Sequence, residues 1–179
     1  IESTLDRFET YPAFSEDGKW LYFCSSRAHK VPVHADSMRY DLCRIAFDAE
    51  TGTYGDTVET IIPAAELEKS VTFPRPSYDG KWLMYCWSDF GNFPIDHKEA
   101  DLWLLNLETG ERMPAANANS DCTESYHNWS SDSRWFVFAS RREDGLYSLL
   151  YLATIDDEGN ISKPFLLPQE NPWQFYHSS

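Results

Sequence analysis

Residues 74–82 read P-R-P-S-Y-D-G-K-W, and residues 12–20 read P-A-F-S-E-D-G-K-W. Residues 127–135, H-N-W-S-S-D-S-R-W, form a third copy that keeps fewer of these letters. The serine common to the copies falls at Ser15, Ser77 and Ser130, so the copies recur at similar intervals along the chain. Such recurrence is typical of repeat architectures, in which each repeat is one supersecondary unit.

Each repeat contains four apolar segments that we interpret as β-strands. The segment after the shared turn reads W-L-Y-F-C, W-L-M-Y-C-W or W-F-V-F-A, and short runs of aromatic and branched residues favour a buried strand. The predicted segments are 11–15, 19–25, 41–48 and 57–62 in the first repeat, 73–77, 81–88, 101–108 and 111–114 in the second, and 126–130, 134–140, 148–156 and 161–167 in the third. Residues 64–69, the best helix candidate, form only a short connection.

Turn residues separate these segments at matching places. Asp-Gly pairs at 17–18 and 79–80 lie between apolar runs and predict hairpins, because Gly accepts a positive φ and Asp bonds nearby backbone. The third copy has Asp132-Ser133, which we expect to form a less favourable version of the same turn. Gly-bearing turns at 50–52, 108–110 and 157–160 join the third and fourth segments. Each repeat is therefore predicted to be an up-and-down antiparallel sheet.

A single four-stranded sheet with two apolar faces buries them by stacking on copies of itself, and radial stacking produces a β-propeller. We predict an all-β chain, one propeller segment over residues 1–179 with three four-stranded antiparallel blades. The blades are expected at about 7–63, 70–116 and 123–168, with a tail at 169–179.

The repeat also resembles a known family. S-x-D-G-K before an aromatic strand, followed by D-L-W-L-L-N-L-E-T-G-E at 101–111, is similar to the TolB-like (WD-repeat-like) β-propeller repeat of bacterial envelope proteins. Segments 93–107 and 140–151 resemble repeat proteins of Bacteroidetes-type envelopes. The resemblance covers about residues 7–168 and implies a periplasmic or cell-envelope location and a scaffold role. Related repeats occur in the propellers of prolyl oligopeptidase-type and tricorn-type proteases.

Propellers of this family usually have six or seven blades, and three blades do not close a ring. We therefore expect half of a larger propeller, an open crescent, or a homodimer that completes six blades. The aromatic tail N-P-W-Q-F-Y-H-S-S at 171–179 is expected to start a further strand or to cap the last blade.

Composition narrows the classes of partner. The chain has 179 residues, 42% of them hydrophobic and 16% aromatic, and a net charge of −14. This charge repels phosphate backbones and anionic lipid, so we expect no nucleic-acid partner. No apolar run approaches a membrane span, so no membrane insertion is expected, and the first residues carry no signal-peptide pattern. A basic protein or peptide partner fits the charge; the alternative is that the charge serves solubility alone.

The cysteines Cys24, Cys43, Cys86 and Cys122 have no C-x-x-C spacing. Cys24 and Cys86 occupy the same place in two repeats, and Ala139 takes that place in the third. A position that accepts Cys or Ala is typical of a small buried site, and nothing in the spacing argues for a disulfide.

Long connections are predicted on one face of the blades, at 27–40, 63–72, 89–100 and 115–125, whereas 141–147 is short. Long loops on a rigid scaffold often carry binding sites. They alternatively pad the face or contact further blades. The candidate binding residues are Arg27, His34, Asp89, His97, His127, Arg141 and Arg142.

Two of these assignments leave alternatives open. Arg27, Asp89 and Arg142 follow the second strand of their repeats and either bind a carboxylate or peptide at one rim or form salt bridges between blades. His127 replaces Pro12 and Pro74 and either lines a central channel or is a satisfied structural histidine.

No catalytic constellation is predicted. The chain has no G-x-S-x-G nucleophile elbow, and the spacing of His29, His34 and Asp36 matches no recognised metal cluster, so we expect no metal and no cofactor. The sequence thus favours a non-enzymatic module that binds a protein or peptide through its long-loop face. The alternatives are the propeller portion of a larger peptidase-type enzyme, or a carbohydrate-binding propeller supported by seven tryptophans.

Overall fold

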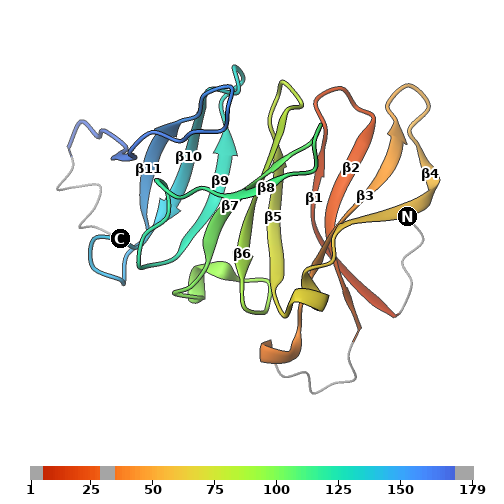
Figure 1. The fold of residues 1–179 in the computed structure, drawn as a ribbon, viewed down its shortest axis with the longest axis horizontal. Helices are drawn as coiled ribbons and strands as arrows, with labels where there is room; N and C mark the ends of the chain where they lie inside the picture. The colour runs from red at the N-terminus through yellow and green to blue at the C-terminus, as the bar shows by residue number, and fades with distance from the viewer. Residues whose placement is uncertain (1–5, 29–34, 172–179) are drawn as a thin grey trace.

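The computed structural model describes residues 6–28 and 35–171 (Figure 1). These residues form three four-stranded antiparallel sheets with the orders β1-β2-β3-β4, β5-β6-β7-β8 and β9-β10-β11-β12. The prediction of three four-stranded blades is confirmed. Below, the sheets are called blades 1, 2 and 3 in chain order.

The strands begin and end as follows. Blade 1 contains β1 (Arg7–Phe14), β2 (Trp20–Arg27), β3 (Asp41–Asp48) and β4 (Thr53–Ile62). Blade 2 contains β5 (Ser70–Pro76), β6 (Trp82–Ser88), β7 (Asp101–Asn106) and β8 (Arg112–Pro114). Blade 3 contains β9 (Glu124–Trp129), β10 (Trp135–Ser140), β11 (Leu149–Thr154) and β12 (Phe165–Leu166). Three short 3-10 helices lie in the connections: η1 (Ala35–Ser37), η2 (Ala64–Leu67) and η3 (Pro94–Asp96).

The shared nine-residue stretch is a hydrogen-bonded turn between the first two strands of each blade. In blade 2 the Ser77 hydroxyl donates to Asp79 at 2.6 Å and accepts from the Trp82 amide at 2.9 Å, while Asp79 accepts from the Lys81 amide at 3.0 Å. Blades 1 and 3 repeat these bonds. The third copy keeps the turn although Ser133 replaces Gly, and Ser133 takes the left-handed φ of 59°.

The innermost strand of each blade carries an aromatic residue in an unusual conformation. Tyr11, Phe73 and Tyr126 have φ values of 54°, 52° and 49°, and each lies where the pairing register shifts. Positive φ is uncommon for bulky residues and is tolerated at a bulge that packing stabilises. The rings of Tyr11 and Phe73 are 4.1 Å apart and those of Phe73 and Tyr126 are 4.8 Å apart. This aromatic ladder runs across the three inner strands.

Apolar side chains fill the spaces between neighbouring blades. Between blades 2 and 3, Trp82 and Met84 pack with Phe136 and Phe138 in one buried cluster. A second cluster lies between blades 1 and 2. Strand alternation explains the arrangement, because successive side chains of the second strand point to opposite neighbours.

The fourth strand of blade 3 is shorter than predicted. Only Phe165 and Leu166 pair with β11, and an isolated bridge joins Ile155 to Ile161. Pro164 lies between these two pairings and has no amide proton to donate to a ladder. Predicted segment 161–167 is therefore interrupted, whereas β4 begins earlier than residue 57.

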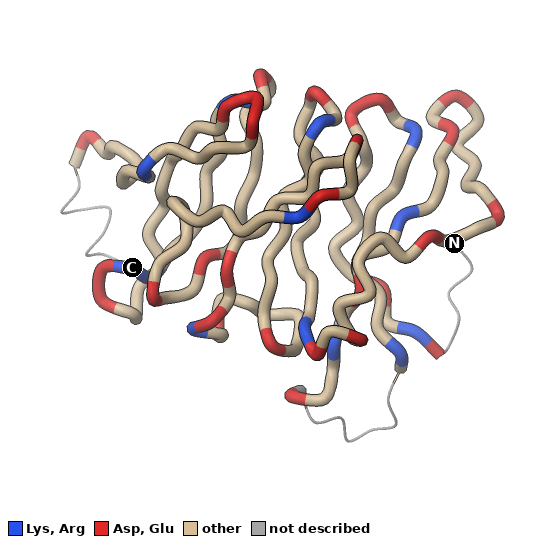
Figure 2. The backbone as a smooth tube through the Cα atoms, viewed as in Figure 1, with Lys and Arg blue, Asp and Glu red and all other residues tan. Residues whose placement is uncertain are grey.

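The connections separate into two faces, as the alternation of strands requires. Short turns lie along the upper edge in Figure 1, called the turn face, and longer connections lie along the lower edge, called the loop face. Figure 2 shows Asp and Glu mainly in the connections at both edges, whereas the middles of the strands are largely neutral.

Candidate functional site

A groove of about 590 Å³ lies on the loop face between the connections of blades 2 and 3. We call it the loop-face groove. It is lined by Ile95, Asp96 and Lys98 before β7, by Cys122 and Thr123 before β9, and by Arg141, Arg142, Glu143, Asp144 and Gly145 after β10.

Local hydrogen bonds hold the walls of this groove. The Asp144 carboxylate accepts from the amides of Leu146 and Tyr147 at 2.8 and 3.0 Å, and these bonds lower its pKa. On the opposite wall the Thr123 hydroxyl donates to the Pro94 carbonyl at 2.8 Å. The Arg141 amide donates to the Thr123 carbonyl at 3.3 Å, which joins the two walls. Hydrogen bonds within each wall and one between the walls thus hold the backbone that forms the groove.

A buried carboxylate lies beneath the groove. Glu124 is 0% exposed and accepts hydrogen bonds from the hydroxyls of Ser120 and Ser140 at 2.6 and 2.8 Å. Arg142 donates to Glu124 at 3.2 Å, to Ser140 at 2.9 Å and to the Ala118 carbonyl. A buried carboxylate is stable only when a counter-charge and hydrogen bonds replace its lost hydration. Arg142 supplies that counter-charge to Glu124, so we assign it a structural role.

Asp101 lies near this network at the start of β7. Burial and, to a smaller extent, the charge of Glu124 raise its pKa to about 6, and the charge of Lys69 opposes this shift. The raised pKa means that the ionised form of Asp101 is disfavoured by loss of hydration and by repulsion from Glu124. Asp41, at the same place in blade 1, instead accepts from the Ala65 amide at 2.9 Å.

Arg141 differs from its neighbour Arg142. Its Nε donates to the Ser148 hydroxyl at 3.4 Å, and within residues 6–28 and 35–171 it has no carboxylate partner. Lys98, across the groove, likewise forms no ion pair with any described residue. The groove therefore presents two cations without a carboxylate partner among the described residues. Beside them lie the exposed acids Asp144, which accepts the two amides named above, and Glu143, which accepts from the Tyr151 hydroxyl at 2.6 Å.

The other predicted site residues do not join this groove. Asp89 forms an ion pair with Lys69, directly before β5 of the same blade, and His97 contacts Glu99 at 3.1 Å. Arg27 ends β2 and is exposed on blade 1, and His34 lies outside the described residues. Both ion pairs near the predicted rim, Lys69–Asp89 and Arg142–Glu124, lie within one blade rather than between blades.

His127 is buried between blades 2 and 3. Its Nε2 lies 3.0 Å from the Met84 carbonyl and its Nδ1 lies 3.8 Å from the Cys86 thiol. Burial lowers its pKa to about 4, so the imidazole is neutral at physiological pH. Of the two alternatives from the sequence, the structure places His127 as a hydrogen-bonded interior residue away from solvent.

All residues that line the groove fall in connections predicted from the sequence, 89–100, 115–125 and 141–147, but only Arg141 and Arg142 among them were named as candidates. Cys122, Thr123, Glu143 and Asp144 carry no repeated motif. The Asp144-Gly145 pair was an available signal, since it has the same turn chemistry as the repeated Asp-Gly pairs.

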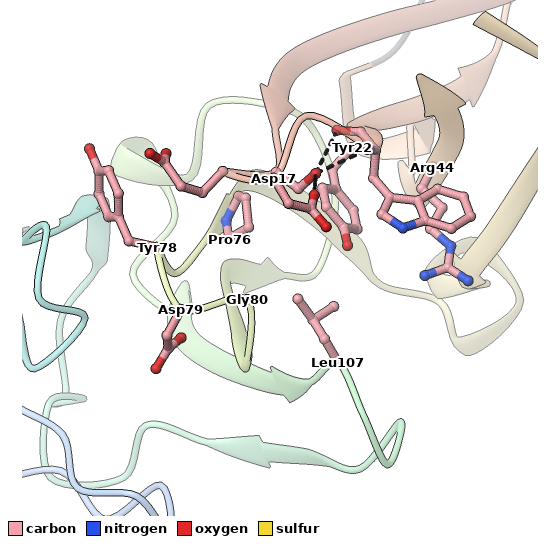
Figure 3. Close-up of a pocket in the computed structure, with 11 residues that line it drawn as sticks. Asp17, Tyr22, Arg44, Pro76, Tyr78, Asp79, Gly80 and Leu107 are labelled. Atoms are coloured by element: carbon pink, nitrogen blue, oxygen red, sulfur yellow. Dashed lines mark hydrogen bonds between the residues drawn. The ribbon is translucent and has the colours of Figure 1, made fainter. Parts of the chain in front are cut away.

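A smaller hollow of about 250 Å³ lies on the turn face between blades 1 and 2. Figure 3 shows it between Asp17 and Tyr22 of blade 1 and Asp79, Gly80 and Leu107 of blade 2. Unlike the groove, it has an arginine, Arg44, that already has a carboxylate partner. Asp17 accepts from Ser15 and the Lys19 amide, which lowers its pKa, and Arg44 pairs with Glu59 at 2.8 Å and covers the Trp20 ring. We therefore regard the loop-face groove as the stronger candidate.

Two tryptophans outside the repeat bear on carbohydrate binding. Trp87 is partly buried, with its ring 5.7 Å from that of Trp103 and the Arg112 guanidinium 5.3 Å from its centroid. Trp173 lies outside the described residues. Trp87 thus presents only part of its surface for stacking on a sugar.

Within residues 6–28 and 35–171, no three His, Cys, Asp or Glu side chains gather closely enough to hold a metal ion. The same residues include no helix with the length and apolar character required to span a bilayer. All four cysteines are free; Cys24, Cys43 and Cys86 are buried and Cys122 is partly exposed.

Comparisons with known proteins match the architecture. The propeller domain of the Trilobed protease from Pyrococcus furiosus, which has an open velcro topology, superposes with a TM-score of 0.51 and 14% identity over 92% of this chain and 44% of that one. Oligogalacturonate lyase from Vibrio parahaemolyticus superposes with a TM-score of 0.53 and 14% identity, over 89% of this chain and 39% of that one. Prolyl oligopeptidase B from Galerina marginata superposes with a TM-score of 0.54 and 12% identity, over 90% of this chain and 23% of that one.

The three sheets are blades of a β-propeller. The chain spans less than half the length of each of these three structures, and at such identities the likeness concerns the fold alone. No protein-family model and no curated protein sequence matches the chain.

Proposed function

We propose that this propeller segment is a non-enzymatic module that binds an extended peptide segment of a partner protein in the loop-face groove. The observation that carries the proposal is the pair of cations without a carboxylate partner among the described residues, Arg141 and Lys98, beside the exposed acids Glu143 and Asp144 in a groove of about 590 Å³. A peptide offers both kinds of complementary charge, together with backbone groups for hydrogen bonding.

Electrostatics favour a partner with net positive charge. The chain carries a net charge of −14, which accelerates the approach of a basic partner at low ionic strength. Within the groove, Glu143 and Asp144 are suited to Lys or Arg side chains of the peptide. Arg141 is suited to a carboxylate, which its planar guanidinium binds with two parallel hydrogen bonds.

The TolB-like assignment and the periplasmic or cell-envelope location belong to this proposal. They rest on the repeat pattern S-x-D-G-K and the segment at 101–111. The propeller fold is compatible with them, as it is with many other functions.

The test is fluorescence anisotropy with three labelled decapeptides of net positive, neutral and net negative charge, each with a free carboxyl terminus. The proposal expects the positive peptide to bind most tightly at low salt. Arg141→Glu should weaken binding about tenfold, a typical loss for one charge-assisted contact. Arg134→Glu on the turn face is the matched control and should leave binding unchanged. Equal losses for both variants, or no binding of any peptide, would contradict the proposal.

A second candidate is the propeller portion of a peptidase-type enzyme, gating a hydrolase domain. Two of the three structural neighbours are a protease propeller domain and a prolyl oligopeptidase. Adding the positively charged decapeptide to the full-length natural protein and following cleavage by mass spectrometry separates the candidates. Cleavage would favour the enzyme, and binding without cleavage would favour the non-enzymatic module.

A carbohydrate-binding propeller is a third candidate, supported by Trp20 and the exposed Tyr78 around the turn-face hollow. An oligosaccharide array with the wild type and with Tyr78→Ala tests it. Retained glycan binding in Arg141→Glu, together with loss in Tyr78→Ala, would favour this candidate over the peptide-binding module.

A further inference from the structure

The outer strands of the three blades differ in length. β4 contains ten residues, whereas β8 contains three and β12 contains two. Within residues 6–28 and 35–171, β4 pairs only with β3, so its other edge carries backbone amides and carbonyls without a described partner (Figure 1). Neighbouring blades pack against the faces of a blade and not against its outer edge. The addition of further blades to the ring would therefore leave this edge open.

The sequences of the outer strands protect blades 2 and 3 but not blade 1. An exposed edge strand can pair with another chain, and proteins prevent this with very short edge strands, Lys and Pro. β8 ends at Pro114, and Lys163 and Pro164 directly precede β12. β4, Thr53–Ile62, contains no Lys, Arg or Pro, and five of its last six residues are β-branched. Since β-branched residues favour strands, the open edge of β4 is suited to accept another strand.

The side chains of β4 alternate between two faces. Register shifts lie on either side of residues 58–60, and within them Val58 pairs with Ile45 and Glu59 with Arg44. Because successive side chains of a strand point to opposite faces, Val58 and Glu59 lie on different sides of the sheet. Val58 is 47% exposed, whereas Glu59 lies on the side that faces blade 2 and binds Arg44 at 2.8 Å. An added strand would therefore direct its side chains alternately beside Val58 and toward blade 2.

A hollow of about 410 Å³ lies on the side of β4 that faces blade 2, and we call it the edge hollow. It is lined by Arg44, by Glu59, Thr60 and Ile61 of β4, and by residues 105–110 of blade 2. Glu108 in its wall is exposed, as is Asp56 on β4, and neither forms an ion pair with a described residue. The unpaired charges at this edge are therefore acidic, and Lys or Arg side chains complement them.

We propose that the open edge of β4 binds an extended basic segment of a partner protein as a fifth strand of blade 1. The backbone groups of β4 supply the hydrogen bonds, and alternate side chains of the segment supply specificity. Lys or Arg side chains enter the edge hollow toward Glu108, and β-branched side chains on the opposite face pack beside Val58. This site shares no residue with the loop-face groove, so it does not rest on the proposed function.

The test is fluorescence anisotropy at physiological salt with a labelled peptide of about nine residues, in which Lys and Val alternate and both ends are capped. The caps remove the terminal carboxylate that would suit Arg141. The peptide is also made in two N-methylated forms, one methylated at the Lys amides and one at the Val amides. Since only every second amide of an added strand points toward β4, one form should bind about tenfold more weakly or worse, and the other should bind like the unmodified peptide. Equal losses in both forms, no loss in either, or no binding of the unmodified peptide would overturn the proposal.

A substitution on β4 locates the site. Val58→Lys places a charge at the edge, as proteins do to block strand addition, and should weaken binding about tenfold. Leu166→Lys makes the same charge change on β12, at a side chain that is 37% exposed, and should leave binding unchanged. Equal losses in the two variants would assign the effect to net charge, and loss in Arg141→Glu with full binding in Val58→Lys would assign the peptide to the loop-face groove; either result would overturn the proposal. Urea unfolding checks that both Lys variants are folded, and the N-methylated peptides test the wild type independently of them.

Discussion

Trp82 of blade 2 lies directly against Gly159 of blade 3, and a Cβ added at Gly159 would be 2.8 Å from the indole Cη2. Gly159 also has a left-handed φ of 89°. The turn between the last two strands of blade 3 therefore covers the tryptophan that begins the second strand of blade 2. The equivalent Gly110 of blade 2 has open space around it, and Trp20 of blade 1 is covered by the Arg44 guanidinium instead.

Gly159→Ala should destabilise the protein by about 2 to 3 kcal/mol, because it combines the strain of a positive φ with overpacking against Trp82. Gly110→Ala is the matched control, since Gly110 has a similar φ but open space around it. It should cost only about 1 kcal/mol. Urea unfolding measures both values, and equal losses would show that the Trp82 contact adds nothing.

Acidification should reveal the burial of His127. Its pKa is about 4 in the folded protein and ordinarily about 6.5 in an unfolded chain. Because the folded value is the lower one, its contribution to stability is complete above pH 6.5 and is lost as the pH falls toward 4. The loss is about 3 kcal/mol.

The measurement is urea unfolding of the wild type and of His127→Asn between pH 7.5 and 4.5. The variant is expected to be less stable at pH 7.5 and to show a smaller decline with acid than the wild type does. Parallel curves for the two proteins would contradict the assignment.

Asp101 should produce the opposite trend. Burial raises its pKa to about 6, above the ordinary value of 3.8. The folded state therefore disfavours its ionised form, and this cost is present above pH 6 and disappears as the pH falls toward 3.8. Asp101→Asn should stabilise the protein at pH 7.5, and the gain should vanish near pH 4. Thermal unfolding at the two pH values checks this, and a pH-independent difference would count against it.

Neighbouring arginines should behave differently on substitution. Arg142→Met leaves the buried Glu124 carboxylate without its cation and should cost about 3 kcal/mol or more. Arg141→Met should change the free energy of unfolding by less than about 0.5 kcal/mol, because Arg141 forms no ion pair among the described residues. Chemical denaturation distinguishes the two, and similar losses would show that Arg141 is also structural.

Cys122 should react with thiol reagents well before the other cysteines. Burial raises the pKa of Cys24, Cys43 and Cys86, which reduces both their thiolate fraction and their access to reagent. Cys122 is partly exposed and lines the loop-face groove. Labelling with a chromogenic disulfide should show one fast thiol, absent in Cys122→Ser, and the bound basic decapeptide should slow it. Four equal rates would contradict the burial of the other three.

The turn stretches were predictable because their chemistry is local. Ser77, Asp79 and Gly80 lie within a few residues of each other and bond one another, so their letters specify the turn in any blade. The apolar runs beginning at Trp20, Trp82 and Trp135 specified strands for the same reason, and self-similarity then implied stacking. Proline at 164 was visible in the sequence, but whether the strand continued around it depended on pairing with β11.

The sequence by itself determined the repeat, its four strands and the side of the blades that carries long connections, since these follow from spacing and from turn residues acting over short range. Only the tertiary structure decided which of two residues of the same type is structural and which is available for binding. Arg141 and Arg142 are adjacent in the connection after β10 and both line the groove, yet Arg142 reaches the buried Glu124 whereas Arg141 has no carboxylate partner among the described residues. Likewise His127 became an interior residue because Met84 and Cys86 of another blade enclose it. Charge pairing and burial depend on which residues from distant parts of the chain lie within a few ångströms. The spacing of residues along the sequence does not give those distances in space.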